Sequence, residues 1–255
     1  MTLILALDCA DGMILASDGQ ATIGTVGQPL KGPAEKIFCP WQNVAWGASG
    51  QVGVSQHVAH AMYETFPSPD AFMGDNAWDI RQKLVQTVLT AMTTYLPGVP
   101  PANLQTAFLF IARGTDRRCI LEIAASILYE DHIDRGYSAI GSGEMFPYVA
   151  LGGLSHFKVR ARTLHGAKLV AHRVMDDAIN VAAQWIGPPI QMIELVDPQA
   201  AGGPVATRKL VEDEIKILRD KVEEWKQVEG ETLAQVVGLP VEGEEGAPGE
   251  PASAG

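Results

Sequence analysis

Short apolar runs separated by a glycine-containing turn open the chain. Residues 2–8 and 13–17 are rich in leucine, isoleucine and alanine, and Gly12 lies between them. Two β-prone runs across such a turn are typical of a β-hairpin. Comparable runs predict further strands at residues 43–48, 105–113, 119–125, 127–133, 137–140 and 190–196.

Helical periodicity follows the first strands. Residues 51–66 carry apolar side chains at every fourth position, and residues 78–96 repeat the pattern with Ile80, Leu84 and Val88. This spacing places the apolar side chains on one face of a helix. Two more helices are expected at residues 145–157 and 164–185.

The order of these elements groups strands with strands and helices with helices. Such segregation predicts an α+β fold built in layers, in contrast to the alternation of strand and helix in a parallel α/β sheet. Two stacked antiparallel sheets between helix layers satisfy the order. Residues 1–199 are therefore expected to form one domain.

The composition changes after residue 199. Residues 200–204 read as a linker, and residues 206–229 predict an appended amphipathic helix. Its apolar positions follow a heptad-like spacing, which fits either a helix lying on its own domain or a contact between subunits. They are Val211, Ile215, Leu218, Val222 and Trp225. Residues 240–255 are rich in Gly, Pro and Glu, and we expect an acidic, disordered tail.

The charge, the apolar runs and the cysteine content of the chain each argue against certain partners or cofactors. The 255 residues carry a formal net charge of −11, which argues against a nucleic-acid partner. No apolar run reaches the roughly 20 residues that a membrane helix requires, so no membrane partner is expected. The three cysteines lie at no metal-ligand spacing and read as reduced thiols, which favours a cytoplasmic protein without a metal or other cofactor.

The most informative position is Thr2. Removal of Met1 would leave a free amine and a hydroxyl on one residue, and this pairing is a known route to an activated nucleophile. Asp18 and Lys36 are the charged residues that such a site would need nearby. An ammonium close to the terminal amine disfavours protonation of that amine and keeps it available as a base.

Several short strings occur in the order and spacing of one enzyme family. They are residues 2–18, Asp18-Gly-Gln-Ala-Thr22 with Gly24, Lys31-Gly32 to Lys36, Trp46-Gly-Ala-Ser-Gly50 and Ala139-Ile-Gly-Ser-Gly143. On these strings the chain resembles the proteasome β subunits and the bacterial HslV peptidase, which are N-terminal-nucleophile hydrolases. The second and last strings read closest to HslV. The resemblance implies a four-layer αββα sandwich and a homo-oligomeric ring.

The resemblance also implies roles for individual residues. Thr2 would be the nucleophile, Asp18 would hold Lys36 charged, and Ser142 would position the terminal amine. Lys31 competes with Lys36, which is favoured by its strand-like context. For the oxyanion hole, counting from Lys36 favours Gly50, whereas matching the strand that ends at residue 45 points to Gly47.

The sequence therefore predicts a threonine peptidase subunit that cleaves peptides or unfolded proteins through an acyl-enzyme, with an unfoldase as a possible partner. One departure from the β subunits is that residues 185–189 read Trp-Ile-Gly-Pro-Pro, where those proteins carry Asp-x-x-Ser. Two alternatives are a structural ring subunit without activity and a small-molecule amidase of the same fold class.

Overall fold

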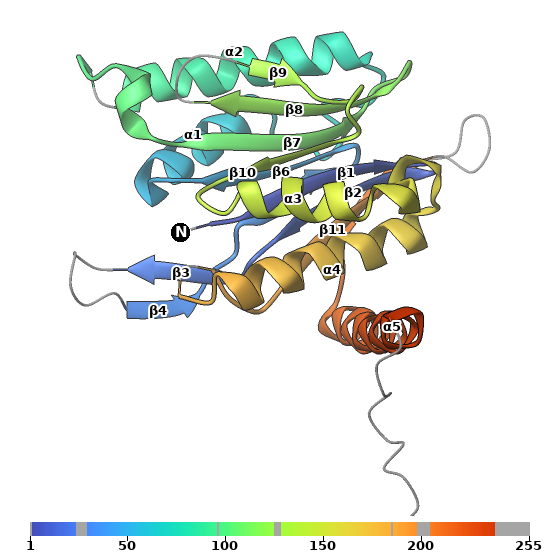
Figure 1. The fold of residues 1–255 in the computed structure, drawn as a ribbon. Helices are drawn as coiled ribbons and strands as arrows, with labels where there is room; N and C mark the ends of the chain where they lie inside the picture. Colours follow the sequence, from blue (N-terminus) through green and yellow to red (C-terminus); the bar gives the residue numbers. More distant parts are fainter. Residues whose placement is uncertain are drawn as a thin grey trace, which may run out of the picture.

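Two five-stranded antiparallel sheets, stacked face to face, form the centre of the molecule (Figure 1). The structure is a computed structural model that describes residues 2–23, 30–95, 97–124, 129–184, 186–197 and 205–237. Helices cover the outer face of each sheet, so the layers run helix, sheet, sheet, helix. The α+β class and the αββα sandwich expected from the sequence are confirmed.

The first sheet has the strand order β10-β1-β2-β11-β12. These strands are β1 (Ile4–Cys9), β2 (Gly12–Ser17), β10 (Tyr137–Ile140), β11 (Gln191–Val196) and β12 (Ala206–Lys209). Every residue of β1 and β2 is buried, because the second sheet covers one face of the hairpin and helices cover the other. This is why both strands are continuous apolar runs instead of alternating ones.

The second sheet has the order β5-β6-β7-β8-β9, and a small two-stranded sheet lies apart from both. The five strands are β5 (Ile37–Trp41), β6 (Val44–Ser49), β7 (Ala107–Arg113), β8 (Arg118–Ala124) and β9 (Tyr129–Asp131). The small sheet pairs β3 (Gln20–Ile23) with β4 (Leu30–Pro33). The sequence did not predict this pair, because its strands lie in a stretch that reads as a glycine- and proline-containing loop.

Two helices cover each sheet. The second sheet is covered by α1 (Val52–Thr65) and α2 (Ala77–Tyr95), and the first by α3 (Met145–Gly153) and α4 (Leu164–Val181). Short 3₁₀ segments lie at Pro101–Leu104 (η1), Ser155–Phe157 (η2) and Val159–Ala161 (η3). Periodicity predicted α1 and α2, and the helices expected at residues 145–157 and 164–185 correspond to α3 and α4, each of which ends four residues earlier. In the described part of the chain, no helix is long and apolar enough to cross a membrane.

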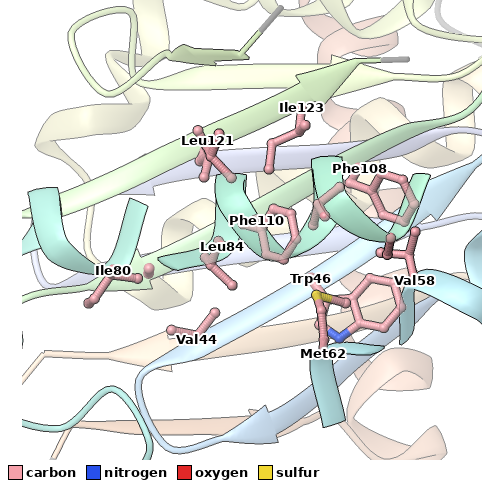
Figure 2. Close-up of a cluster of buried hydrophobic side chains, with 14 of the residues drawn as sticks. Val44, Trp46, Val58, Met62, Ile80, Leu84, Phe108, Phe110, Leu121 and Ile123 are labelled. Carbon is pink, nitrogen blue, oxygen red and sulfur yellow. The ribbon is translucent and has the colours of Figure 1, made fainter. Parts of the chain in front are cut away.

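Apolar side chains fill each of the three interfaces between layers. The aromatic side chains of Trp46, Phe108 and Phe110 meet Val58 and Leu84 under α1 and α2 (Figure 2). A second cluster lies between the first sheet and α3 with α4, and a third lies between the two sheets. Each fully buried side chain of this kind stabilises the fold by roughly 1.5–3 kcal/mol before ordering costs.

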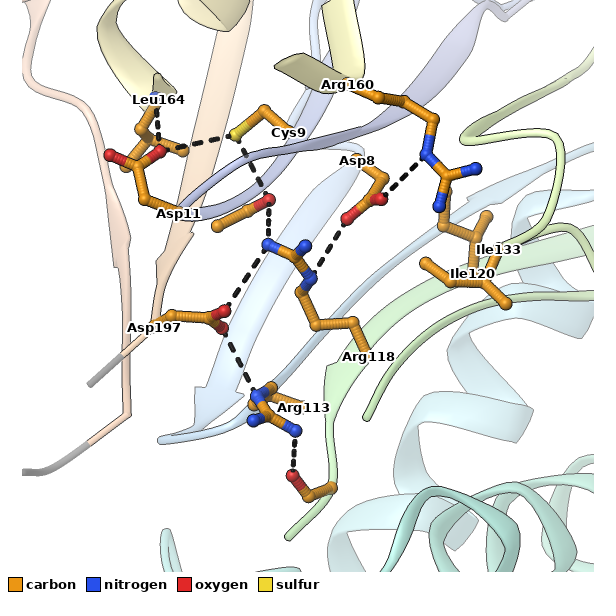
Figure 3. A network of polar contacts seen from close by, with 12 residues as sticks. Asp8, Cys9, Asp11, Arg113, Arg118, Ile120, Ile133, Arg160, Leu164 and Asp197 are labelled. Carbon is orange, nitrogen blue, oxygen red and sulfur yellow. Dashed lines mark hydrogen bonds and ion pairs between the residues drawn. The ribbon is translucent and has the colours of Figure 1, made fainter. Parts of the chain in front are cut away.

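A network of ion pairs joins the two sheets at the end of β1 that lies farthest from Thr2 (Figure 3). Asp8 of β1 is buried and lies 3.0 Å from Arg118 of β8 and 3.3 Å from Arg160. Arg118 also pairs with Asp197, and Asp197 pairs with Arg113. Burial raises the pKa of Asp8, and the two arginines act in the opposite direction. The network therefore links the two sheets at this end of the sandwich.

The segment after residue 205 differs from the expected appended helix. Residues 206–209 form β12, which pairs with β11 as the edge strand of the first sheet, and α5 (Glu212–Val237) is longer than expected. The sheet is thus not complete at residue 199. Residues 200–204 and the acidic tail expected at 240–255 lie outside the described residues.

The apolar seam of α5 lies mostly against its own domain. Leu218 and Val222 are buried in the cluster under α4, and Ile215 and Trp225 pack against the same cluster. The fifth seam residue, Val211, is exposed. Lys226 of α5 also forms an ion pair with Asp176 of α4. The seam therefore stabilises the domain itself.

Candidate active site

Strand register brings three separate segments together at Thr2. Ile4 of β1 lies opposite Ser17 of β2 and opposite Ile140 of β10. Extending the two antiparallel registers by one residue places Leu3 opposite Asp18 and Gly141, and extending them by two places Thr2 opposite Gly19 and Ser142.

Asp18 is the polar centre of this end of the sheet. Its side chain is fully buried, and Oδ1 accepts hydrogen bonds from the backbone N–H of Leu3 at 2.9 Å and from the Lys36 ammonium at 2.7 Å. Oδ2 accepts the backbone N–H groups of Gln20 and Gly187, each at 3.3 Å. Four donors therefore compensate the buried carboxylate, as a buried charge requires.

Lys36 connects the two sheets. It directly precedes β5 of the second sheet and is buried, yet its ammonium reaches Asp18 of the first sheet. Burial lowers the pKa of Lys36, and the charge of Asp18 opposes that shift. Lys31, the alternative to Lys36 in the sequence analysis, lies in β4, and its side chain is outside the described part of the structure.

The Gln191 side chain fixes the segment that carries Lys36. Its amide oxygen accepts the backbone N–H of Lys36 at 3.4 Å, and its amide nitrogen donates to the Ala34 carbonyl at 2.5 Å. Gln191 begins β11 of the first sheet, so this contact also bridges the two sheets. The bond holds the lysine backbone and leaves the ammonium directed at Asp18.

The two glycines considered for the oxyanion hole occupy different environments. Gly47 lies within β6, buried opposite Ile37, and is not among the cleft residues. Gly50 follows β6 just before α1, lines the same cleft as Thr2 and has φ +113°, which favours glycine. A Cβ there would collide with the Gln105 carbonyl oxygen. Of the two glycines, Gly50 is therefore the one that lines the cleft with Thr2, and its role in an oxyanion hole stays a prediction.

The turn after β10 wraps around the backbone of Thr2. Gly141 has φ +103°, and a Cβ at this position would collide with the Thr2 carbonyl oxygen. The N–H of Gly143 donates to that same oxygen at 3.5 Å. Ser142, between the two glycines, is exposed and lines the cleft. The turn therefore positions Thr2 through its backbone and presents the Ser142 hydroxyl beside it.

These residues open onto a cleft of about 840 Å³. Thr2, Lys36, Gly50 and Ser142 all line it, and Asp18 is buried behind them. One wall is apolar and comes from β5, β6 and α1, with Phe38, Trp46, Ala48, Val52 and Ala59. Polar lining comes from Ser49, Gln105, Glu35 and Glu144. A concave, mostly apolar cleft with a few convergent polar groups is typical of a small-molecule or peptide site.

Two contributors to this site were missed from the sequence. Gly187 binds Asp18 through its backbone N–H, so the segment that replaces Asp-x-x-Ser lies against the buried carboxylate. Gln191 acts through its side chain from a strand that otherwise reads as apolar core. Almost every residue has a backbone N–H, so the residue type at position 187 does not predict the contact with Asp18. Nothing in the strand pattern predicts that Gln191 links the two sheets.

We find no metal-binding cluster of side chains in the described part of the chain. No group of three or more His, Cys, Asp or Glu side chains there has the geometry to hold a metal ion. His57 and His60 lie on α1, and His60 pairs with Glu64 one turn away.

Comparison with known proteins places the fold. No protein-family model matches the chain. The structure is similar to that of an Anbu (Gly-1) mutant from Hyphomicrobium sp. strain MC1, with a TM-score of 0.70 and 14% identity, over 93% of this chain and 100% of that one. It is also similar to Anbu (ancestral beta-subunit) from Yersinia bercovieri, with a TM-score of 0.67 and 15% identity, over 93% and 97%. The chain has the proteasome-like fold of N-terminal-nucleophile hydrolases.

This finding corrects the resemblance drawn from the sequence. The neighbours are Anbu proteins, which form a family distinct from HslV, so the assignment to the HslV type is wrong. The misleading strings have a structural explanation. Gly141 is required by its contact with Thr2, and Asp18 is required by the four donors around it. Such strings reflect the demands of the fold and do not identify a family within it.

Proposed function

We propose that this chain is an N-terminal-threonine peptidase that hydrolyses peptide bonds through an acyl-enzyme ester. The observation that carries the proposal is the shared carboxylate of Asp18. It binds the backbone N–H that follows Thr2 and the ammonium of Lys36, within a cleft that Thr2 lines. The proposal is supported by this one oxygen, which binds both the cation of Lys36 and the backbone of the residue after Thr2.

The proposed reaction begins with removal of Met1, which lies outside the described residues. The freed amine of Thr2 accepts the proton of its own Oγ1 as that oxygen attacks the peptide carbonyl. The amine then gives the proton to the leaving nitrogen, and the amide bond breaks to form an ester on Oγ1. Water, activated by the same amine, hydrolyses the ester and regenerates the hydroxyl.

Two groups would assist this reaction. The backbone N–H of Gly50 would donate to the oxyanion, and the charge of Lys36 would keep the terminal amine neutral. An unperturbed α-amino group has a pKa of about 7.7–8.0, so a small downward shift leaves most of it neutral near pH 7.5. The Ser142 hydroxyl would hold the amine or relay its proton.

We further propose that the chain works as a subunit of a homo-oligomeric ring in the cytoplasm, acting on peptides or unfolded proteins that an unfoldase could deliver. Support for the ring comes from the fold shared with Anbu of Yersinia bercovieri, an ancestral beta-subunit. Support for the compartment comes from Cys9, Cys39 and Cys119, which form no disulfide.

A peptide-library cleavage assay tests the proposed activity. We expect the wild-type protein to hydrolyse internal peptide bonds and the Thr2→Ala variant to lose this activity while keeping its fold by circular dichroism and its assembly by ultracentrifugation. Thr2→Ala removes a hydroxyl that contributes little packing, so its thermal unfolding should match the wild type. Wild-type turnover in Thr2→Ala would remove Thr2 from the mechanism.

A further inference from the structure

The charges that line the cleft are unequally compensated. Three charged residues line the cleft among those that the structure describes. One is Lys36, which Asp18 binds at 2.7 Å. Another is Glu35, whose carboxylate is paired with Lys209, also at 2.7 Å. The third is Glu144, which is exposed at the start of α3.

The Glu144 carboxylate has no structural task in its own helix. Glu144 is the N-cap residue of α3, yet its side chain forms no capping hydrogen bond. Its backbone N–H instead closes the turn by donating to the Gly141 carbonyl at 3.0 Å. Within the described ranges, none of the ion pairs found includes Glu144. The carboxylate is thus available to a ligand in the cleft.

A second carboxylate strengthens the negative potential on this wall. Glu122 of β8 lies close enough for its charge, together with burial, to raise the pKa of Glu144. Glu122 itself accepts a hydrogen bond from Ser138 at 3.0 Å and contacts His132 at 3.2 Å. Glu122 is therefore occupied within the protein. A cation placed beside Glu144 would relieve the repulsion between the two carboxylates.

The apolar lining of the cleft suits the stem of a long basic side chain. It includes Phe38, Trp46 and Val52, and Glu144 lines the same cleft. Lysine and arginine side chains bury their methylene stems along apolar surface and keep the charged end at a polar partner. An apolar wall with a carboxylate in the same cleft matches such a side chain.

We propose, on the basis of the peptidase function proposed above, that Glu144 is a specificity-determining residue that selects peptides with a lysine or arginine close to the scissile bond. The selection is electrostatic, so it weakens as ionic strength rises. Glu35 lines the same cleft but is neutralised by Lys209, and it contributes little to the preference.

The test uses fluorogenic peptides of one sequence in which a single position, scanned along the peptide, holds lysine or norleucine. The wild-type protein should favour the best lysine peptide by about fivefold in kcat/KM, the factor that corresponds to about 1 kcal/mol for two charges near 4 Å in water. Glu144→Gln should remove the preference, Glu144→Lys should reverse it, and the matched control Glu35→Gln should keep it. Equal rates for lysine and norleucine at every position would overturn the proposal, as would loss of the preference in Glu35→Gln alone.

Binding to the Thr2→Ala variant separates this inference from the peptidase function. Fluorescence anisotropy with the same peptides should show the lysine preference, and the double variant Thr2→Ala/Glu144→Gln should lack it. A lysine preference in binding without any cleavage by the wild type would contradict the peptidase function and support the role of Glu144. Binding without a preference would overturn the role of Glu144 whether or not peptides are cleaved.

Discussion

The ammonium of Lys36 lies 2.7 Å from Oδ1 of Asp18, and the same oxygen accepts the backbone N–H of Leu3, the residue after Thr2. One buried atom therefore fixes both the position of the threonine and the position of the cation. The contact with Leu3 lies within the β1–β2 hairpin of the first sheet, whereas the contact with Lys36, which directly precedes β5, joins the first sheet to the second. The site is assembled only when the two sheets stack.

Lys36→Met should abolish most of the activity, by roughly 10²–10³-fold, because the oxyanion and the neutral amine both lose a nearby positive charge. It should also lower the free energy of unfolding by about 3–5 kcal/mol, since Met offers the buried Asp18 carboxylate no hydrogen-bond donor, which even a neutral lysine amine would supply. Steady-state kinetics and urea unfolding measure the two effects.

Lys209→Met is the matched control for Lys36. Lys209 forms an ion pair of the same length with Glu35, but Glu35 is exposed and Lys209 is partly exposed, whereas both partners of the Lys36–Asp18 pair are buried. Exposed ion pairs contribute only about 0–1 kcal/mol, so this variant should stay within that range and keep its activity. Equal losses in the two lysine variants would contradict the special role of the buried pair.

The stability of the protein should rise with pH in an alkaline window. Burial lowers the pKa of Lys36 from its usual value of 10.5, so the folded protein releases this proton at a lower pH than the unfolded chain does. Between the two pKa values the unfolded chain holds more protons, and the free energy of unfolding therefore increases with pH. Urea titrations at successive pH values should show this rise, and Lys36→Met should lack it. If the free energy of unfolding of the wild type instead falls over this pH range, and Lys36→Met removes the fall, then the pKa of Lys36 is raised in the folded protein and the prediction is wrong.

Gly141→Ala should lower kcat/KM far more than the cost of placing alanine in a left-handed backbone conformation would explain. The added methyl group would collide with the Thr2 carbonyl oxygen and displace the nucleophile. Gly74→Ala is the control, because Gly74 also has positive φ, at +89°, but faces open space. A left-handed backbone costs a non-glycine residue about 1–2 kcal/mol in both cases. Comparable kcat/KM in the two variants would argue against the close contact at Thr2.

Leu218→Ala should lower the free energy of unfolding by about 2–5 kcal/mol, because the side chain is buried between α5 and the first-sheet cluster. Its neighbour Ile217 is 56% exposed, and Ile217→Ala should stay within about 0.5 kcal/mol. Urea unfolding of both variants measures the difference. Equal stabilities of the two variants would mean that α5 does not stabilise the domain. The apolar seam of α5 would then be better explained as a contact with another subunit.

Much of the fold could be predicted, because the spacing of apolar residues along the chain indicates which side chains are buried. The hairpin of β1 and β2 and the helices α1 and α2 occupy nearly the residues that the spacing indicated. The strand β12 could not be predicted, since Ala-Thr-Arg-Lys has no β-prone pattern and is a strand only through its pairing with β11. Its edge position explains the tolerance for polar side chains.

The site was predictable to the extent that side-chain chemistry defines it. Thr2, Asp18 and Lys36 carry the groups that such a reaction needs, and the fold brings them together. The contributions of Gly187 and Gln191 depend on contacts across more than 150 positions in the chain, which no local pattern encodes. Glu144 reads as an ordinary residue before a helix, and its importance follows only from the uneven pairing of charges in the cleft.

The central claim is that Thr2 becomes the N-terminal residue and carries the acyl group. Intact-mass and tandem mass spectrometry of the native protein, before and after reaction with a β-lactone that acylates activated hydroxyls, tests it directly. We predict a chain that begins at Thr2 and gains one acyl group on Thr2 Oγ1, with no labelling in the Lys36→Met variant. A chain that retains Met1, or an acyl group on any other residue, would contradict the claim.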